Sequence, residues 1–163
     1  MEVMSEGTLL RQATEQDLDE LLALWAYFMR AHALNPAYLL GPDALKERRA
    51  VFSQRLTDLD STVLVLQRPD GGLDGMITCF AELNSPYFLP FRYARIQAPF
   101  VRPDARRKGN LKRLLEAAFD WAREHALQEV RLFTGADNLI ANAVAEELGF
   151  EAIEVIRRRI LRL

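Results

Sequence analysis

The sequence predicts one α/β domain, residues 1–163, whose mixed central β-sheet is flanked by helices on both faces. Three observations predict it. Half of the 163 residues are apolar, which suffices to bury the core of one domain. Hydrophobic periodicity gives the order strand, two helices, three strands, helix, strand, helix, strand. The alternation of strands and helices near the end of the chain requires a parallel crossover, whereas the hairpins before it are antiparallel.

The charge balance and the rare residue types exclude several classes of protein. Lys and Arg number 21 against 23 Asp and Glu, and the net charge of −2 argues against a surface that binds nucleic acid generally. Cys79 is the single cysteine, so we expect no internal disulfide, and with two histidines we expect no metal site. The acidic N-terminus does not fit a secretory signal, and Leu21–Met29 is too short for a membrane span, which needs ~20 residues. We therefore expect a cytoplasmic protein that does not bind membranes.

The first elements are a strand and a helix. Leu9–Gln12 is consistent with a strand, and Thr14 is suited to cap a helix because Asp17 follows three residues later. Apolar residues at helical spacing carry this helix to about Ala33, and Asn35-Pro36 ends it.

A second helix and a hairpin follow. Gly41-Pro42-Asp43 predicts a helix start with Pro42 in the first helical position. The apolar stripe of this helix consists of Leu45, Phe52, Leu56 and Leu59. The segments Thr62–Leu66 and Leu73–Leu83, on either side of the turn Pro69–Gly72, predict a β-hairpin.

The second half begins with an apolar loop, Asn84–Phe91, that contains two prolines. Tyr87, Phe88, Leu89 and Phe91 are too apolar to leave in water, so we expect this loop to cover a substrate pocket or to form a dimer contact. Tyr93–Val101 predicts a strand that Pro99 must bulge or leave unpaired, because proline cannot donate to a sheet. The remaining predicted elements are a helix 110–125, a strand 130–133, a helix 138–148 ended by Gly149, and a strand 150–161.

A basic segment lies between the strand 93–101 and the helix after it. Its cations are Arg102, Arg106, Arg107, Lys108, Lys112 and Arg113. The first turn of a helix has free backbone N–H groups and a partial positive charge, and Gly109 allows a ligand to approach the backbone. The segment is typical of a phosphate-binding turn, with a solvated basic helix start as the alternative.

Two motifs resemble those of the GNAT N-acetyltransferases. Val101-x-Pro103-x-x-Arg106-x-x-Gly109, followed by an amphipathic helix, is similar to the acetyl-CoA-binding motif of that family, although Leu111 stands where the family has Gly or Ala. A second segment matches the family in Asn138, Ala141, Gly149 and Phe150, but Ala145 replaces the tyrosine that often acts as the acid. With the order of elements, the resemblance covers roughly residues 8–161.

The resemblance implies a fold in which acetyl-CoA enters between the strands 93–101 and 130–133. It implies that the backbone of Phe100 and Val101 holds the pantetheine arm. Asn138 would contact this arm or, equally well, cap its own helix. The pyrophosphate would lie on the turn formed by Arg106, Arg107, Lys108, Gly109, Asn110 and Leu111.

The same resemblance implies direct attack on the thioester by a primary amine of a small molecule or peptide. Gln97 occupies the position of the usual catalytic glutamate and cannot act as a base. The alternative candidates are Glu82, His32 and Tyr93, each of which also has a structural interpretation, or a chain of water molecules. Nothing near Cys79 in the sequence would activate its thiol, so we interpret it as a core residue.

Two other functions compete with this one. A coenzyme-binding sensor of the same fold without catalysis is favoured by Gln97 and Ala145. A nucleic-acid-binding protein would use the basic segment, but the sequence lacks interleaved aromatic residues there. The short C-terminal region would leave an open sheet edge, which favours a homodimer.

Overall fold

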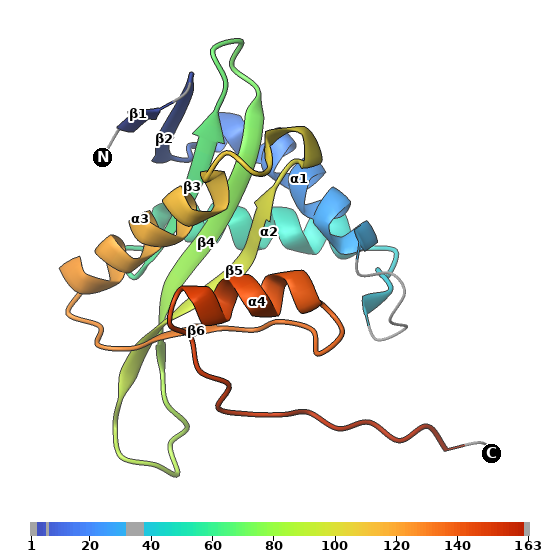
Figure 1. Ribbon diagram of the computed structural model, residues 1–163, viewed down its shortest axis with the longest axis vertical. Helices are drawn as coiled ribbons and strands as arrows, with labels where there is room; N and C mark the ends of the chain where they lie inside the picture. Colours follow the sequence, from blue (N-terminus) through green and yellow to red (C-terminus); the bar gives the residue numbers. More distant parts are fainter. Residues whose placement is uncertain (1–2, 6, 32–37, 162–163) are drawn as a thin grey trace. The chain divides into compact units, whose positions relative to one another are not determined.

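The computed structural model describes residues 3–5, 7–31 and 38–161. Met1–Leu132 form one compact unit and Phe133–Leu163 a second. The first unit contains β1 Val3–Ser5, β2 Thr8–Gln12, α1 Leu18–Ala31, α2 Ala44–Thr57, β3 Ser61–Gln67, β4 Leu73–Leu83, β5 Arg92–Val101, α3 Asn110–Glu124 and β6 Val130–Leu132 (Figure 1). The second unit contains α4 Leu139–Glu147.

The strands lie side by side in chain order. Within the described residues the sheet has six strands, β1 to β6. Neighbouring strands are antiparallel from β1 to β5, and β5 and β6 are parallel. The prediction of a mixed sheet is therefore confirmed. β1 was not predicted, because three residues are too few to show a period of two.

Helices of the first unit cover both faces of the sheet, as predicted. In Figure 1, α1 and α2 lie on one face and α3 on the other. Between the sheet and the first pair is a buried core that contains Leu21, Leu24, Phe52, Val63, Val65, Leu73, Met76, Ala98 and Phe100. The buried face of α3 consists of Asn110, Leu114, Leu115, Ala118, Trp121 and Ala122. No helix in the described part of the chain is long and apolar enough to cross a membrane.

The start of α1 follows the predicted capping pattern. The backbone N–H of Thr14 donates to a carboxylate oxygen of Asp17 at 2.7 Å, and Arg11 donates to both oxygens of that carboxylate at 2.8 Å. The first three residues form a 3-10 turn, and the α-helix runs from Leu18. The predicted end at Ala33 lies outside the described residues.

Helix α2 differs from its prediction at its start. Asp43 is the N-cap residue, so Pro42 precedes the cap instead of occupying the first helical position. Phe52 is fully buried, but Leu45 and Leu59 are exposed. Arg48 takes a buried place on the inner face instead, one helical turn before Phe52.

The second unit is a capped helix followed by an extended segment. Asn138 accepts a hydrogen bond from the backbone N–H of Ala141 at 3.2 Å, which confirms that its side chain caps α4. Gly149 ends the helix with φ +84°, and the N–H of Phe150 bonds back to the carbonyl of Ala145 at 3.0 Å.

The predicted C-terminal strand 150–161 is wrong. These residues have no helix or strand conformation, and residues 151–161 are all exposed. Their β-branched residues favour a strand only where a half-buried sheet surface receives them, and the described chain offers them no pairing partner.

Candidate active site

The basic segment forms a turn with free backbone donors at the start of α3. Gly109, the residue before the helix, has φ +75°, and no side chain caps the helix. The first intrahelical bond at this end joins the N–H of Arg113 to the carbonyl of Gly109 at 3.0 Å. Helix geometry therefore leaves the N–H groups of Asn110, Leu111 and Lys112 without an intrahelical acceptor. With the helix dipole, they make this turn suitable for an anion.

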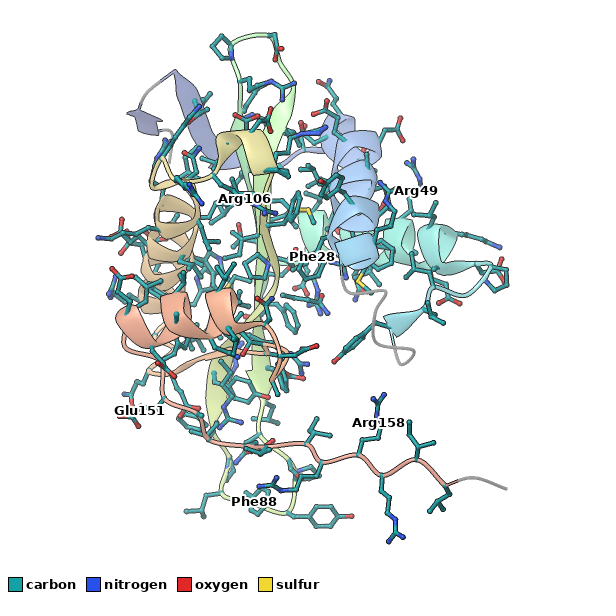
Figure 2. The ribbon with its side chains drawn as sticks, turned by 45° about the vertical axis from the view of Figure 1, so that its right-hand side comes forward. Phe28, Arg49, Phe88, Arg106, Glu151 and Arg158 are labelled. Carbon is teal, nitrogen blue, oxygen red and sulfur yellow. The ribbon has the colours of Figure 1, made fainter. Side chains whose placement is uncertain are left out.

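Three predicted side chains brace this turn. Arg106 Nε donates to the carbonyl of Val101 at 3.0 Å, which ties the turn to the end of β5 (Figure 2). Buried Asn110 donates through Nδ2 to the carbonyl of Ala105 at 2.9 Å. Arg113 Nη1 donates to Thr8 Oγ1 at 2.7 Å, so its charge is directed toward β2. We infer that these side chains shape the turn and leave its backbone N–H groups available to bind an anion.

Other cations of the segment face solvent. Arg107 and Lys108 are exposed, and Lys112, also exposed, lies 3.8 Å from Glu116 across one helical turn. Leu111 is half-buried. Beside the turn is a cavity of about 240 Å³. Its lining consists of Gly7, Thr8, Arg68, Pro69, Asp74, Lys108 and Asn110.

The strand that leads into the turn is bulged at the predicted place. Thr78 pairs with Gln97 and Met76 pairs with Phe100, so two residues of β5, Ala98 and Pro99, face one residue of β4. Ala98 has φ +49°, in the left-handed region that costs an L-residue about 1–2 kcal/mol. The proline supplies no N–H at the point where pairing is interrupted.

A glycine on the neighbouring strand makes room for this bulge. A Cβ atom at Gly75 would lie 2.8 Å from the carbonyl oxygen of Phe100, which no real side chain tolerates without a shift of the backbone. From the side of α1, the rings of Tyr27 and Phe28 pack on that of Phe100, with centroids 5.4 Å and 6.2 Å apart. The ring of Phe100 is thus packed against α1, and its carbonyl lies in the space that Gly75 leaves open.

Strands β5 and β6 part after a short contact. Their parallel pairing runs from Ala94–Val130 to Ile96–Leu132. Beyond Ile96, the described residues give β5 no partner on that side, although the strand continues to Val101. The pairing ends before the bulge because β6 ends at Leu132, and the entry of acetyl-CoA between the two strands stays a prediction.

Two of the candidate acid–base residues lie together, away from the bulge. Tyr93 Oη donates to Glu82 Oε2 at 2.9 Å, and Arg95 Nη1 donates to the same oxygen at 3.1 Å. Burial, followed by the hydrogen bond to Glu82, raises the pKa of the Tyr93 phenol. At about 3.3 Å per strand residue, Tyr93 lies roughly 16 Å along β5 from Ala98. His32 lies outside the described residues.

Gln97, next to the bulge, has a cationic partner that sequence reasoning missed. Arg48 Nη1 donates to Gln97 Oε1 at 3.0 Å. Arg48 is 7% exposed, and its guanidinium carbon lies 4.3 Å from the ring centroid of Phe52 and 5.4 Å from that of Trp25. A sequence signal existed, because Arg48 stands four residues before Phe52 and so shares its face of the helix.

Two further expectations concern Cys79 and the loop between β4 and β5. Burial raises the pKa of the Cys79 thiol to about 12, which confirms that it is an unreactive core residue. In the loop, the side chains of Tyr87, Phe88 and Leu89 are exposed. Figure 2 shows Phe88 at the opposite end of the β4–β5 hairpin from Arg106, so this loop lies away from the turn. Its role in covering an acceptor pocket or in a dimer contact stays a prediction.

Comparison with known proteins places this geometry in a family. The chain matches the acetyltransferase (GNAT) family over residues 17–150. A mutant of the BH1408 protein from Bacillus halodurans has a TM-score of 0.82 and 19% identity, covering 93% of this chain and 99% of that chain. The aminoglycoside antibiotic 6'-N-acetyltransferase AAC(6')-Ih from Acinetobacter baumannii has a TM-score of 0.74 and 21% identity, with coverages of 96% and 99%.

A third solved structure was determined with a ligand. AAC(6')-Iy, in complex with the bisubstrate analog CoA-S-monomethyl-acetylneamine, has a TM-score of 0.74 and 20% identity, with coverages of 96% and 99%. Curated proteins gave no match. The solved structures establish the fold, and the family match spans most of the chain. The protein therefore belongs to the acetyltransferase (GNAT) family.

Proposed function

We propose that this protein is an acetyl-CoA-dependent N-acetyltransferase that acts on a primary amine of a small molecule or peptide. One observation carries the proposal. The bulged end of β5, which has no described partner on the side of β6, leads directly into a turn whose free N–H groups and exposed cations suit a phosphate. Family membership and the ligand in the AAC(6')-Iy structure support it.

The residues of the turn fit the pyrophosphate of coenzyme A. The N–H groups of Asn110 and Leu111 have no intrahelical acceptor, and Lys108 and Arg107 are exposed cations beside them. Leu111, the departure from the family motif, is half-buried, so its side chain is partly withdrawn from solvent. We assign the pyrophosphate to this turn, from Arg106 to Leu111.

The open edge of β5 fits an extended, amide-containing arm. In a strand paired on one side, the N–H and C=O groups of every second residue point to the free side, where a pantetheine arm can bond to them. We assign the arm to the backbone of Phe100 and Val101, of which the Val101 carbonyl also accepts from Arg106 Nε. Asn138 stays a candidate contact through groups not used in its cap.

Acetyl-CoA supplies the acetyl group as a thioester, and the protein must orient the amine and remove its proton. An alkylamine has a pKa of about 10.4, so it is mostly protonated near neutral pH, whereas a thiol of pKa about 8.5 leaves without a strong acid. The inert thiol of Cys79 favours direct attack over a covalent intermediate. We propose Glu82 as the base. Because its partner Tyr93 lies roughly 16 Å along β5 from Ala98, Glu82 would act through a chain of several water molecules on the face of β5 that Tyr93 and Gln97 share.

A coenzyme-binding module without catalysis is the second candidate. The observation that favours it is the hydrogen bond from Arg48 to Gln97, which fills the position of the usual base with a bonded amide. We further propose that the two compact units belong to one N-acetyltransferase domain. We also propose that the protein is cytoplasmic and forms a homodimer.

Calorimetry with acetyl-CoA, followed by an assay of free thiol release over a panel of amines, tests the proposal. Binding with amine-dependent release supports the transferase. Binding without release on any amine supports the second candidate, and absence of binding overturns both.

A further inference from the structure

The guanidinium of Arg48 is buried, and within the described part of the chain two of its three nitrogens have no hydrogen-bond partner. Its Nη1 donates to Gln97, but Nε and Nη2 have no hydrogen-bond partner among the residues that the structure describes. In the same part of the chain, no carboxylate lies within ion-pair distance of Arg48. A charge taken out of water without a partner is costly to the fold, so its presence calls for an explanation.

The two unused donors form one edge of the guanidinium plane. The Nε–H bond and one Nη2–H bond point in the same direction, at the spacing that lets them donate to both oxygens of one carboxylate. Arg11 shows what such pairing looks like when it is satisfied, because its two terminal nitrogens hold both oxygens of Asp17 at 2.8 Å.

The aromatic neighbours do not replace this missing partner. Phe52 and Trp25 lie near the guanidinium carbon, at 4.3 Å and 5.4 Å, and ring faces interact with the cation through its plane. Edge N–H donors are not satisfied by such stacking. These rings do hold the plane in a fixed orientation, which reduces the entropy lost when an anion binds.

Arg48 also keeps its charge in the working range of pH. Burial, followed by the nearby Arg55, lowers the pKa of Arg48 to about 10, so it is protonated near neutral pH. The guanidinium carbon of Arg55 lies 3.6 Å from the ring centroid of Phe80, and its Nη1 lies 3.8 Å from Asp58. The charge of Arg55 is therefore balanced by a carboxylate, whereas that of Arg48 is not balanced by any carboxylate among the described residues.

The position of Arg48 connects it to the proposed reaction. Gln97, which its Nη1 contacts, immediately precedes the Ala98–Pro99 bulge, and Gln97 and Trp25 are half-buried. A few strand residues at about 3.3 Å each separate this contact from Phe100. An amine held at the bulge and an anion held on Arg48 thus fit within one small molecule.

We propose that Arg48 binds the carboxylate of the acceptor through its Nε and Nη2 donors, so that the preferred substrates are amino acids or other amines with a carboxylate within about 10 Å. This inference rests on the proposed function. It assigns Gln97 the task of holding the guanidinium in place by accepting from Nη1.

The test compares matched acids and amides. Glycine, β-alanine, 4-aminobutanoate and 5-aminopentanoate are assayed against their primary amides, and the ratio of kcat/KM for acid over amide is measured. We expect wild-type protein to prefer the acid of at least one pair. Arg48→Met should lower that ratio about 30- to 100-fold, the effect of a lost charge-assisted, bidentate bond. Arg48→Lys keeps the positive charge but loses the two parallel N–H donors, so it should lower the acid-to-amide ratio about tenfold.

Controls separate this inference from the proposed function and from misfolding. Arg49→Met removes an exposed cation of the same helix, one that pairs with Asp19, and should leave the ratio unchanged. Arg48→Met should melt no lower than wild type, because an unpartnered buried charge is lost. If the acid-to-amide ratio of kcat/KM is unchanged in Arg48→Met, the carboxylate site is overturned, and acetylation of amines would still support the transferase.

Absence of turnover on every amine overturns the transferase instead. In that case calorimetry with 4-aminobutanoate and its amide decides the inference. Binding of the acid alone, lost in Arg48→Met, supports it, and absence of binding by the wild-type protein contradicts it.

Discussion

The side chain of Arg106 turns back to the strand that precedes it, and its Nε donates to the carbonyl of Val101 at 3.0 Å. The guanidinium carbon also lies 5.8 Å from the ring centroid of Phe100. This arginine of the family motif therefore links the end of β5 to the turn before α3. The link fixes the distance between the proposed pantetheine edge and the proposed pyrophosphate turn.

Arg106→Ala should weaken acetyl-CoA binding without unfolding the protein. Loss of a charged hydrogen bond frees the turn, and we expect the Kd to rise about tenfold, which corresponds to about 1.4 kcal/mol. Titration calorimetry measures it. Arg123→Ala, an exposed arginine in the last turn of α3, is the control. Equal affinities of the two variants would show that the link does not position the site.

Gly109→Trp should abolish coenzyme binding. A side chain at Gly109 meets no atom within 4 Å, so it projects into the space of the turn, and the φ of +75° adds only about 1–2 kcal/mol of strain. Gly149→Trp, at the end of α4 with φ +84°, is matched in strain, and a side chain there also meets no described atom within 4 Å. Retained affinity in Gly109→Trp, with both variants folded by circular dichroism, would place the pyrophosphate elsewhere.

Glu82→Gln should lower kcat by about 100-fold, the usual contribution of a general base, and leave coenzyme affinity unaltered. Tyr93→Phe removes one donor to Glu82 and should lower kcat less. The raised pKa of Tyr93 keeps the phenol protonated at neutral pH, so it donates to Glu82 and does not compete as a base. Steady-state kinetics over a pH series measures both, and an unchanged kcat in Glu82→Gln excludes it as the base.

Cys79→Ala should retain full turnover. Burial raises the pKa of this thiol to about 12, so it stays protonated and unreactive up to alkaline pH. Native protein should therefore resist alkylation by iodoacetamide, whereas protein unfolded in urea should react. Loss of activity in folded Cys79→Ala would point to a covalent acetyl intermediate and contradict direct attack.

Asp17→Asn should destabilise the fold at neutral pH by about 2 kcal/mol, and less in acid. Hydrogen bonds from Arg11 hold the pKa of Asp17 below its ordinary value. A lowered folded-state pKa stabilises the protein above the unfolded-state value of about 3.9, and the contribution is lost as pH falls through the folded-state pKa. Urea unfolding at pH 7 and near pH 3 measures this, and a pH-independent difference would contradict the ion pair.

Local chemistry made much of this protein predictable. Proline at position 99 lacks an N–H, which predicted either a bulge or an unpaired edge at that point of β5, and the structure has the bulge. Gly109 and the basic residues around it marked the turn, and the spacing of apolar residues marked α3. The capping of α1 by Thr14 and Asp17 depended only on neighbours in sequence.

Features that depend on distant partners were not predictable. Arg48 lies 49 residues from the Gln97 that it contacts, and a charged residue on a helix is usually solvated. Arg113 and Asn110 looked available for a ligand, but their partners are inside the fold. The β-prone segment 150–161 lacks a strand because propensity supplies no pairing partner.

Mass spectrometry of reaction mixtures with acetyl-CoA and a panel of primary amines tests the central claim most directly. The account predicts an amine that carries one additional acetyl group, formed only with protein present and not formed by Gly109→Trp. Binding of acetyl-CoA with no acetylated product from any amine would contradict the transferase and leave a coenzyme-binding module.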